Sequence, residues 1–198
     1  LENFDVQNRD QALISIELKK AMALIRKHEN EEAEKKINRA SSLAPGYFEV
    51  ERVRALNWFV SGDYAEAKEA YLMAIELKPS YAPLYFWYGG FLLRAFNDFE
   101  GAIGAFTKAN ELSPSDLVKR ERARVYLYAG EFAKSRMEIE KILEVETGSR
   151  NSKHLTILYD VKLQSYTREI EHQASGGDFI TALETLAAAR QYCETIPE

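Results

Sequence analysis

One pattern of spacing recurs along the chain and limits what it can fold into. After the turn residue Gly62, small or apolar residues follow at the fifth, ninth and twelfth positions, and a proline follows at the seventeenth: Ala67, Tyr71, Ala74 and Pro79. The pattern recurs after four other turn residues, although its last two copies end without the proline: His28, Asn97, Gly130 and Gly177. The five turn residues are spaced by 34, 35, 33 and 47 residues, which indicates a repeat protein.

The spacing is helical. Steps of four and three residues return to one face of a helix, and the small residues on that face let a neighbouring helix come close. Proline cannot continue a helix, so it ends each unit. The glycines suit a left-handed residue that closes the preceding helix, and Asp63, Asp98 and Asp178 follow as predicted caps of the next one.

A first amphipathic helix precedes each turn, so every unit is a helix pair. We predict first helices near 8–27, 48–61, 82–96, 116–129 and 153–175, and second helices near 30–43, 64–78, 99–112, 132–146 and 178–194. One pair cannot bury its apolar face alone, so successive pairs must stack. The predicted fold class is all-α, an α-α superhelix (solenoid) of about five helix-turn-helix repeats with a concave and a convex side.

Composition narrows the class of protein. The 198 residues are 46% hydrophobic, which is enough for a single folded domain over 1–198. The net charge of −5 counts against nucleic acid as the main partner. Cys193 is the one cysteine and cannot form an internal disulfide, and no apolar run is long enough to span a membrane, so we expect a cytoplasmic protein. Because the chain opens on Leu1, we expect it to be an excerpt of a larger protein, with any targeting signal outside it.

Two units resemble the tetratricopeptide repeat family through their turn, aromatic and alanine positions. Gly62–Pro79 reads G-D-Y-x-x-A-x-x-x-Y-x-x-A-x-x-x-x-P, and Asn97–Pro114 reads N-D-F-x-x-A-x-x-x-F-x-x-A-x-x-x-x-P. The resemblance covers roughly 14–194 and divides it into repeat units of 14–47, 48–81, 82–115, 116–147 and 153–196. The 47-residue spacing departs from the family and predicts a loop at Thr147–Ser152 and a lengthened first helix in the last repeat.

The resemblance implies a protein-protein interaction scaffold that binds a peptide or partner helix in the concave groove. In this family the first helices line that groove, so the predicted binding residues are Arg52, Leu56, Phe86, Trp87, Gly90, Arg94, Arg120 and Arg124. Some members hold an acidic C-terminus through a clamp that needs an asparagine where this chain has Phe86 and Trp87. We therefore expect a mixed aromatic and basic groove instead of that clamp.

Arg120 and Arg124 lie one turn apart and suit bidentate binding of a carboxylate, such as an acidic segment or C-terminus, or of a phosphate. The alternative is a solvated charged face on which they pair with Glu121 or Asp116. Gly101 and Gly104 are expected to let two helices pack closely. Gly90 is expected to open space for a ligand backbone.

No catalytic, metal or cofactor site is expected. His154 and His172 are 18 residues apart on one predicted helix, about 27 Å by helical rise, so they cannot share an ion. No nucleophile, base and oxyanion site can be assembled from the sequence, so we predict no enzyme. Two alternatives to the scaffold remain: self-association through the apolar C-terminal helix, and RNA binding, which needs a basic stripe that the sequence lacks.

Overall fold

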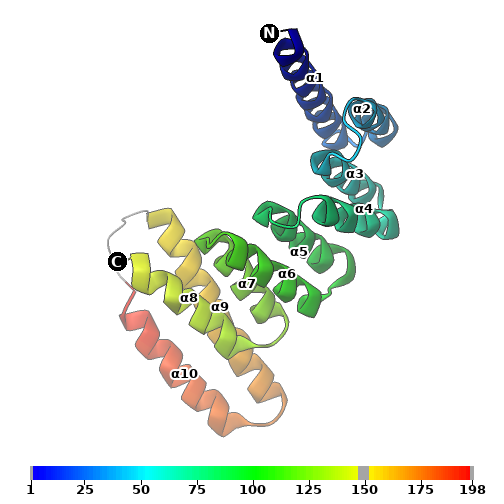
Figure 1. Ribbon diagram of the computed structural model, residues 1–198. Coiled ribbons are helices and arrows are strands. Elements are labelled where there is room, and N and C mark those ends of the chain that lie inside the picture. Colours follow the sequence, from blue (N-terminus) through cyan, green and yellow to red (C-terminus); the bar gives the residue numbers. More distant parts are fainter. Residues whose placement is uncertain (1, 147–151, 197–198) are drawn as a thin grey trace. The chain divides into compact units, whose positions relative to one another are not determined.

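The chain is all-α. The computed structural model describes residues 2–146 and 152–196, which form ten helices in successive pairs (Figure 1). The first helices are α1 (Glu2–Ile25), α3 (Phe48–Ser61), α5 (Ala82–Phe96), α7 (Asp116–Tyr128) and α9 (Ser152–Ser175). The second helices are α2 (Asn30–Leu43), α4 (Tyr64–Leu77), α6 (Phe99–Leu112), α8 (Phe132–Glu146) and α10 (Phe179–Glu194). The predicted class, a helical repeat of five pairs, is confirmed.

The predicted boundaries agree with the observed helices to within one residue, apart from both ends of α1, which was predicted over 8–27 and ends at Ile25. This helix begins at Glu2 and has 24 residues. The first helix of the last repeat was predicted to be lengthened, and this is confirmed, since α9 also has 24 residues. The predicted loop lies outside the described residues, except that Ser152 already begins α9.

All five turn residues adopt the left-handed conformation. Their φ angles are 60° at His28, 90° at Gly62, 52° at Asn97, 78° at Gly130 and 82° at Gly177. His28 and Asn97 are the non-glycine residues with positive φ in the described part of the chain, and both stand at this repeat position. The repeat therefore imposes the turn even where a side chain makes that conformation unfavourable.

The predicted caps are only partly correct. The side chain of Asp98 accepts a hydrogen bond from the Gly101 N–H at 2.8 Å. Asp178 likewise accepts from the Thr181 N–H at 3.2 Å. The cap predicted at Asp63 is wrong, because that side chain makes no cap hydrogen bond.

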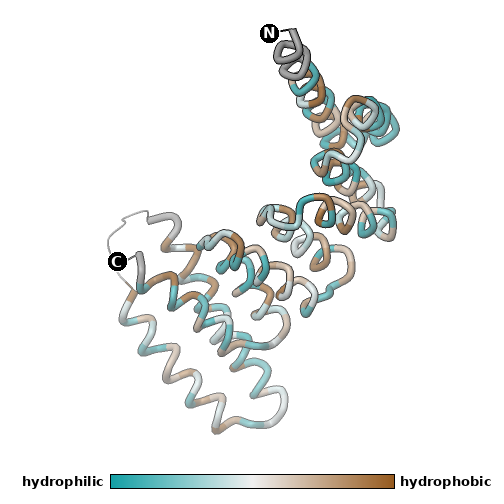
Figure 2. Tube along the Cα trace, in the orientation of Figure 1, coloured by the Kyte–Doolittle hydropathy of each residue, from teal (hydrophilic) through white to brown (hydrophobic). Residues whose placement is uncertain are grey.

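The chain divides into two compact units, Leu1–Phe96 (unit 1) and Asn97–Glu198 (unit 2). Each helix carries both hydrophobic and hydrophilic residues, as expected when one of its faces packs against other helices and the other faces solvent (Figure 2). The repeat positions that the spacing singled out supply much of each core, with Ala33, Ile37 and Ala40 in unit 1 and Ile139 and Ile142 in unit 2 fully buried. The single domain over 1–198 stays a prediction.

Every helix in the described ranges is too short or too polar to cross a membrane.

Candidate functional site

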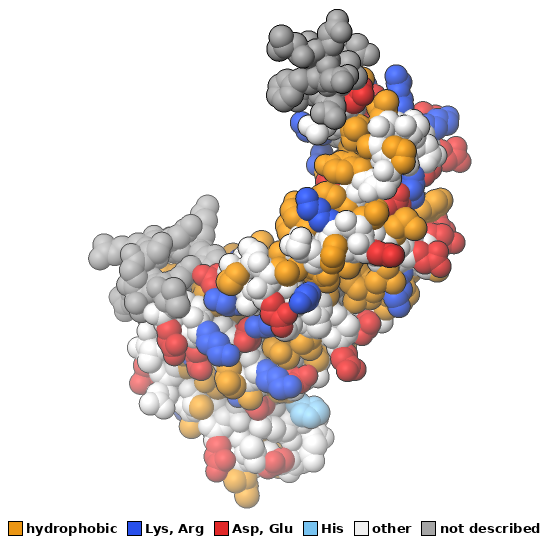
Figure 3. All heavy atoms as spheres, in the orientation of Figure 1, with side chains coloured by type: hydrophobic (Ala, Val, Ile, Leu, Met, Phe, Trp, Pro, Cys, Tyr) orange, Lys and Arg blue, Asp and Glu red, His pale blue; other side chains and the backbone are white. Residues whose placement is uncertain are grey.

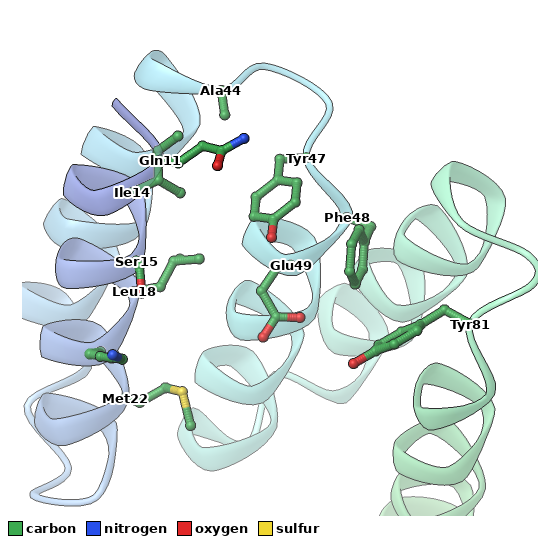
Figure 4. A pocket seen from close by; sticks show the side chains of 11 residues that line it. Gln11, Ile14, Ser15, Leu18, Met22, Ala44, Tyr47, Phe48, Glu49 and Tyr81 are labelled. Carbon is green, nitrogen blue, oxygen red and sulfur yellow. The ribbon is translucent and has the colours of Figure 1, made fainter. Parts of the chain in front are cut away.

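Unit 1 contains an open pocket beside its first helices (Figure 4). Its volume is about 680 Å³. Side chains of α1 lie on one side and residues at the start of α3 lie opposite (Figure 4). The lining consists of Gln11, Ile14, Ser15, Leu18, Lys19 and Met22 from α1, Phe48 and Glu49 from α3, and Ala44, Tyr47 and Tyr81 from two turns. The floor is apolar, and polar groups stand around it.

Two equivalent turns deliver the tyrosines of this pocket. The Tyr47 N–H donates to the Ala44 carbonyl at 3.2 Å, and the Tyr47 carbonyl accepts from the Val50 N–H at 2.9 Å. Tyr81, 34 positions later in the sequence, repeats this arrangement with Lys78 and Leu84 at 3.2 and 3.0 Å. The turn that joins one repeat to the next thus places a tyrosine at the same position in two successive repeats.

Aromatic rings form a row along this side of unit 1. The ring centres of Tyr47 and Phe48 are 5.2 Å apart, and those of Phe48 and Tyr81 are also 5.2 Å apart. Tyr81 is followed by Trp87 at 6.4 Å. The Lys78 ammonium lies 4.9 Å from the centre of the Phe48 ring, a cation–π distance. Such rigid rings with polar tips are well suited to partner contacts.

The guanidinium of Arg52 is bound to other side chains of unit 1. Its Nε and Nη2 donate to the two carboxylate oxygens of Glu49 at 2.9 and 2.5 Å. Its guanidinium carbon lies 4.3 Å from the centre of the Trp87 ring, and its Nη2 lies 3.8 Å from the sulfur of Met22. Arg52 is 7% exposed. Because its charge is already paired, it orients Trp87 and joins α1, α3 and α5, and it offers no free cation to a carboxylate.

Arg94 and Gly90 lie together. A Cβ atom placed on Gly90 would be 3.2 Å from Nη2 of Arg94, so the missing side chain leaves room for this guanidinium. The same guanidinium is 5.7 Å from the centre of the Phe59 ring. Arg94 is exposed and remains available to a ligand.

Tyr71 on α4 lies near both arginines of unit 1. Burial raises the pKa of its hydroxyl, while the charges of Arg52 and Arg94 oppose that rise. Of the other predicted residues, Leu56 packs against the hydrophobic core of unit 1, and Phe86 and Trp87 are half-buried.

Arg120 and Arg124, the two predicted residues of unit 2, share one acidic partner. Arg120 lies 3.4 Å and Arg124 lies 3.3 Å from the carboxylate of Glu121. A hydrogen bond with Tyr128 raises the pKa of Arg124 most, and Glu121 raises it further, whereas burial acts in the opposite direction. The alternative in which these arginines pair locally is therefore present in the structure, and Lys119 likewise pairs with Asp116 at 2.8 Å.

The pocket residues Tyr47, Phe48 and Tyr81 were not among the predicted binding residues. A sequence signal for them exists, since Pro45 and Pro79 are each followed two residues later by tyrosine. This repeat of proline and tyrosine across two successive turns is the signal that points to the pocket.

Charges are mixed over the surface. On the face drawn in Figure 3, basic and acidic side chains are interspersed within each unit and form no continuous basic stripe. Among the described residues, no group of three or more His, Cys, Asp or Glu is placed to hold a metal ion.

Comparison with known proteins identifies the fold. No protein-family model matches the chain, and no curated protein matches its sequence. The structure of PilF from Pseudomonas aeruginosa is similar, with a TM-score of 0.63 and 18% identity over 92% of this chain and 93% of that one. The crystal structure of PilW, described as a type IV pilus biogenesis factor, has a TM-score of 0.60 and 19% identity over 90% of both chains.

A third similar structure belongs to an assembly. A chain in the structure of Naa15/Naa10 bound to HypK-THB has a TM-score of 0.61 and 17% identity over 96% of this chain, which spans only 26% of that one. All three neighbours contain tetratricopeptide repeats.

Proposed function

We propose that this chain, which has the fold of tetratricopeptide-repeat proteins, is a non-enzymatic scaffold that binds another protein. The observation that carries the proposal is the pocket between α1 and the start of α3, because it opens on the first helices of unit 1. Ligand pockets of this type are concave and mostly apolar, with a few polar groups that fix orientation. The Naa15/Naa10 structure with HypK-THB supports the proposal, since a chain of this fold takes part there in a protein assembly.

The pocket favours an apolar anchor over an acidic one. Ile14, Leu18 and Met22 form the floor, and the rings of Tyr47 and Tyr81 stand at the edge. Arg52, which contacts the pocket residue Met22, already pairs with Glu49. We therefore propose that a peptide or partner helix inserts an aromatic or aliphatic side chain here, while Gln11, Ser15 and Lys19 bond its polar groups.

The residues predicted from the sequence enter this proposal in different roles. Arg52 supports the pocket through its contacts with Met22 and Glu49, and Leu56 packs in the core of unit 1. Four residues of α5 extend the surface of unit 1: Phe86, Trp87, Gly90 and Arg94. Arg120 and Arg124 form a separate surface on unit 2, where an acidic ligand would have to displace Glu121. The cytoplasmic location stays a prediction.

A random-peptide display library tests the pocket. Peptides selected on the wild-type chain should bind Ser15→Trp at least about tenfold more weakly, since the indole fills the space for the anchor. Ser15 is exposed on α1, so the fold should be unaffected. Met73→Trp on α4, which also enlarges an exposed side chain, is the matched control and should bind as the wild type does. Equal affinities for Ser15→Trp and the wild type would remove the pocket from the proposal.

A further inference from the structure

The last helix exposes an apolar face. Phe179, Ile180 and Leu183 on α10 are 64%, 76% and 65% exposed. A shallow depression of about 330 Å³ follows this face and includes Leu186, Ala187 and Arg190. The described part of α10 packs against α9 through the opposite side, where Ala182, Ala189 and Tyr192 are buried.

The equivalent positions on the other second helices contact the first helix of the following repeat. The sixth residue after the turn does so in three repeats: Glu34 bonds Arg54 at 3.2 Å, Arg136 bonds Glu169 at 2.5 Å, and Lys68 lies 5.8 Å from the Phe96 ring. The tenth residue does so as well: Asn38 bonds Arg54 at 3.1 Å, Thr107 bonds Arg122 at 3.0 Å, and Glu140 bonds Lys162 at 2.8 Å. On α10 these two positions are Leu183 and Ala187. The exposed face is therefore built to accept a first helix.

The first helix α1 exposes the complementary face. The residue twelve positions before the turn is buried in three other first helices, as Val50, Val118 and Ser165. In α1 this residue is Ile16, which is 45% exposed, and Leu13 beside it is 37% exposed. Within the described ranges α1 packs against α2 and α3, and Leu13 and Ile16 stay exposed.

The two faces fit one another in size. In the observed junctions, the tenth residue of the second helix meets a residue eight or fifteen positions before the next turn. The same register places Ala187 opposite the stretch of α1 from Leu13 to Lys20. Ile16 and Leu13 would then pack over a small residue, as bulky and small side chains alternate within each repeat.

The two faces also fit in charge. Arg190 lies three residues beyond Ala187, so in an antiparallel pair it faces positions three residues earlier in α1 than Leu13 and Lys20, which are Asp10 and Glu17. One carboxylate oxygen of Glu17 accepts from Lys20 at 3.2 Å, while the other is buried without a partner. In the equivalent pair of α3, both oxygens of Glu51 accept from Arg54. Because this oxygen of Glu17 is enclosed by its own chain, and Glu51 is bonded from within its own helix, Asp10 is the carboxylate that Arg190 would pair with.

We propose that α10 of one copy packs against α1 of a second copy, in the way that a second helix packs against the next first helix within the chain. The contact is heterologous, so each copy binds one neighbour through its α10 face and another neighbour through its α1 face. Copies therefore add head to tail, because every addition leaves one free face of each kind. This inference is independent of the proposed pocket, which lies on another side of α1.

Mass measurement with two variants tests the arrangement. Light scattering after gel filtration should show the wild-type chain rising above 22.6 kDa as its concentration increases. Leu183→Glu and Ile16→Glu should each remain at the monomer mass, because a charge then blocks one of the two faces. An equimolar mixture of the two variants should form a species of twice that mass, since one variant retains an intact α1 face and the other an intact α10 face.

Two controls keep the test specific. Met73→Glu, at a comparably exposed apolar residue on α4, should associate as the wild type does, and circular dichroism should show unchanged helix content in all variants. A wild-type chain that stays monomeric up to about 1 mM would overturn the proposal. Association that survives in Ile16→Glu, or a mixture that stays monomeric, would also overturn it, because either result requires a contact other than α10 on α1.

Discussion

The junction between α4 and α5 and the junction between α8 and α9 occupy the same place in the repeat but use different chemistry. In the first, which lies in unit 1, Tyr71 and Phe91 pack with ring centres 5.1 Å apart, and Tyr88 and Phe59 surround them. In the second, which lies in unit 2, Arg136 pairs with Glu169, and Glu140 pairs with Lys162. Ile139 and Ile142 of α8 also share an apolar core with Leu158 and Val161 of α9, so the repeat fixes where helices meet and buries apolar area in both junctions, and it leaves open whether aromatic rings or ion pairs are added.

The difference has an energetic consequence. Buried aromatic area stabilises a junction with little dependence on ionic strength, and edge-to-face ring pairs add to it. Partly buried ion pairs add specificity, but much of their attraction offsets the cost of removing charges from water. We therefore expect the aromatic junction to contribute more to stability and the ionic junction to be easier to replace.

Phe91→Ala should produce the largest loss. This side chain is 1% exposed and contacts the rings of Phe59, Tyr71, Tyr88 and Phe96. Removing it from a packed core should lower the free energy of unfolding by about 3–5 kcal/mol. Both tryptophans of the chain lie in unit 1, so urea unfolding followed by tryptophan fluorescence measures this junction. Leu72→Ala, at an exposed residue of α4, should change it by less than about 0.5 kcal/mol, and equal effects would show that the ring cluster is not the main support.

Arg136→Ala should come next, with a loss of about 2 kcal/mol, because it leaves the carboxylate of Glu169 partly buried without its partner. It also removes the guanidinium that lies 4.5 Å from the Tyr166 ring. The double variant Arg136→Met with Glu169→Leu should recover most of this loss, since apolar side chains of similar volume can replace an ion pair. Urea unfolding followed by circular dichroism gives both values. A double variant that loses as much as the single one would mean that the ionic junction is not replaceable, and the contrast with unit 1 would fail.

Most of the fold could be predicted from the sequence, and much less of the site. Helix ends follow from local rules such as proline stops and left-handed turn residues, and five copies of the pattern reinforce one another. The role of Arg52 does not follow from such rules. From the sequence alone, its guanidinium could bind Glu49, stack on Trp87 or remain in solvent. Only the packing of α1, α3 and α5 determines that it does the first two. The pocket likewise forms only when side chains of α1 pack beside Tyr47 and Tyr81. The repeat pattern does not indicate that these residues meet.

The hydroxyl of Tyr192 gives a pH-dependent contrast with Tyr71. Burial, followed by the neighbouring Tyr159 and Tyr166, raises the pKa of Tyr192, and no arginine opposes this as Arg52 and Arg94 do at Tyr71. The folded state therefore keeps a proton that the unfolded state loses near pH 10, so stability is full below about pH 10 and falls above it. Tyr192→Phe should make that fall shallower by up to about 1.4 kcal/mol per pH unit.

Urea unfolding at a series of alkaline pH values measures the slope for Tyr192. At pH 7 Tyr192→Phe should be neutral or slightly stabilising, because the buried hydroxyl has no hydrogen-bond partner. An unchanged alkaline slope would show that Tyr192 titrates alike in the folded and unfolded states.

The smallest effects should come from the helix caps, where the two units also differ. Asp98 and Asp178 in unit 2 make cap hydrogen bonds, and Asp63 in unit 1 does not. Asp98→Ala in unit 2 should lower the free energy of unfolding by about 1 kcal/mol, and Asp178→Ala, with a longer bond, by about 0.5 kcal/mol. Asp63→Ala at the equivalent position of unit 1 should leave it nearly unchanged, because that side chain caps nothing.

Gly101 sharpens the contrast between the caps. A Cβ atom there would lie 2.4 Å from the Asp98 carboxylate, so the glycine makes room for the cap and not, as the sequence suggested, for a neighbouring helix. Gly101→Ala should therefore forfeit the cap and offset the usual gain of about 1 kcal/mol from replacing a helical glycine. Gly104→Ala on the same helix, with no atom within 4 Å of the new Cβ, should show that gain in full. If both substitutions stabilise equally in thermal unfolding, the Asp98 cap contributes little, and the turns of the two units are energetically alike.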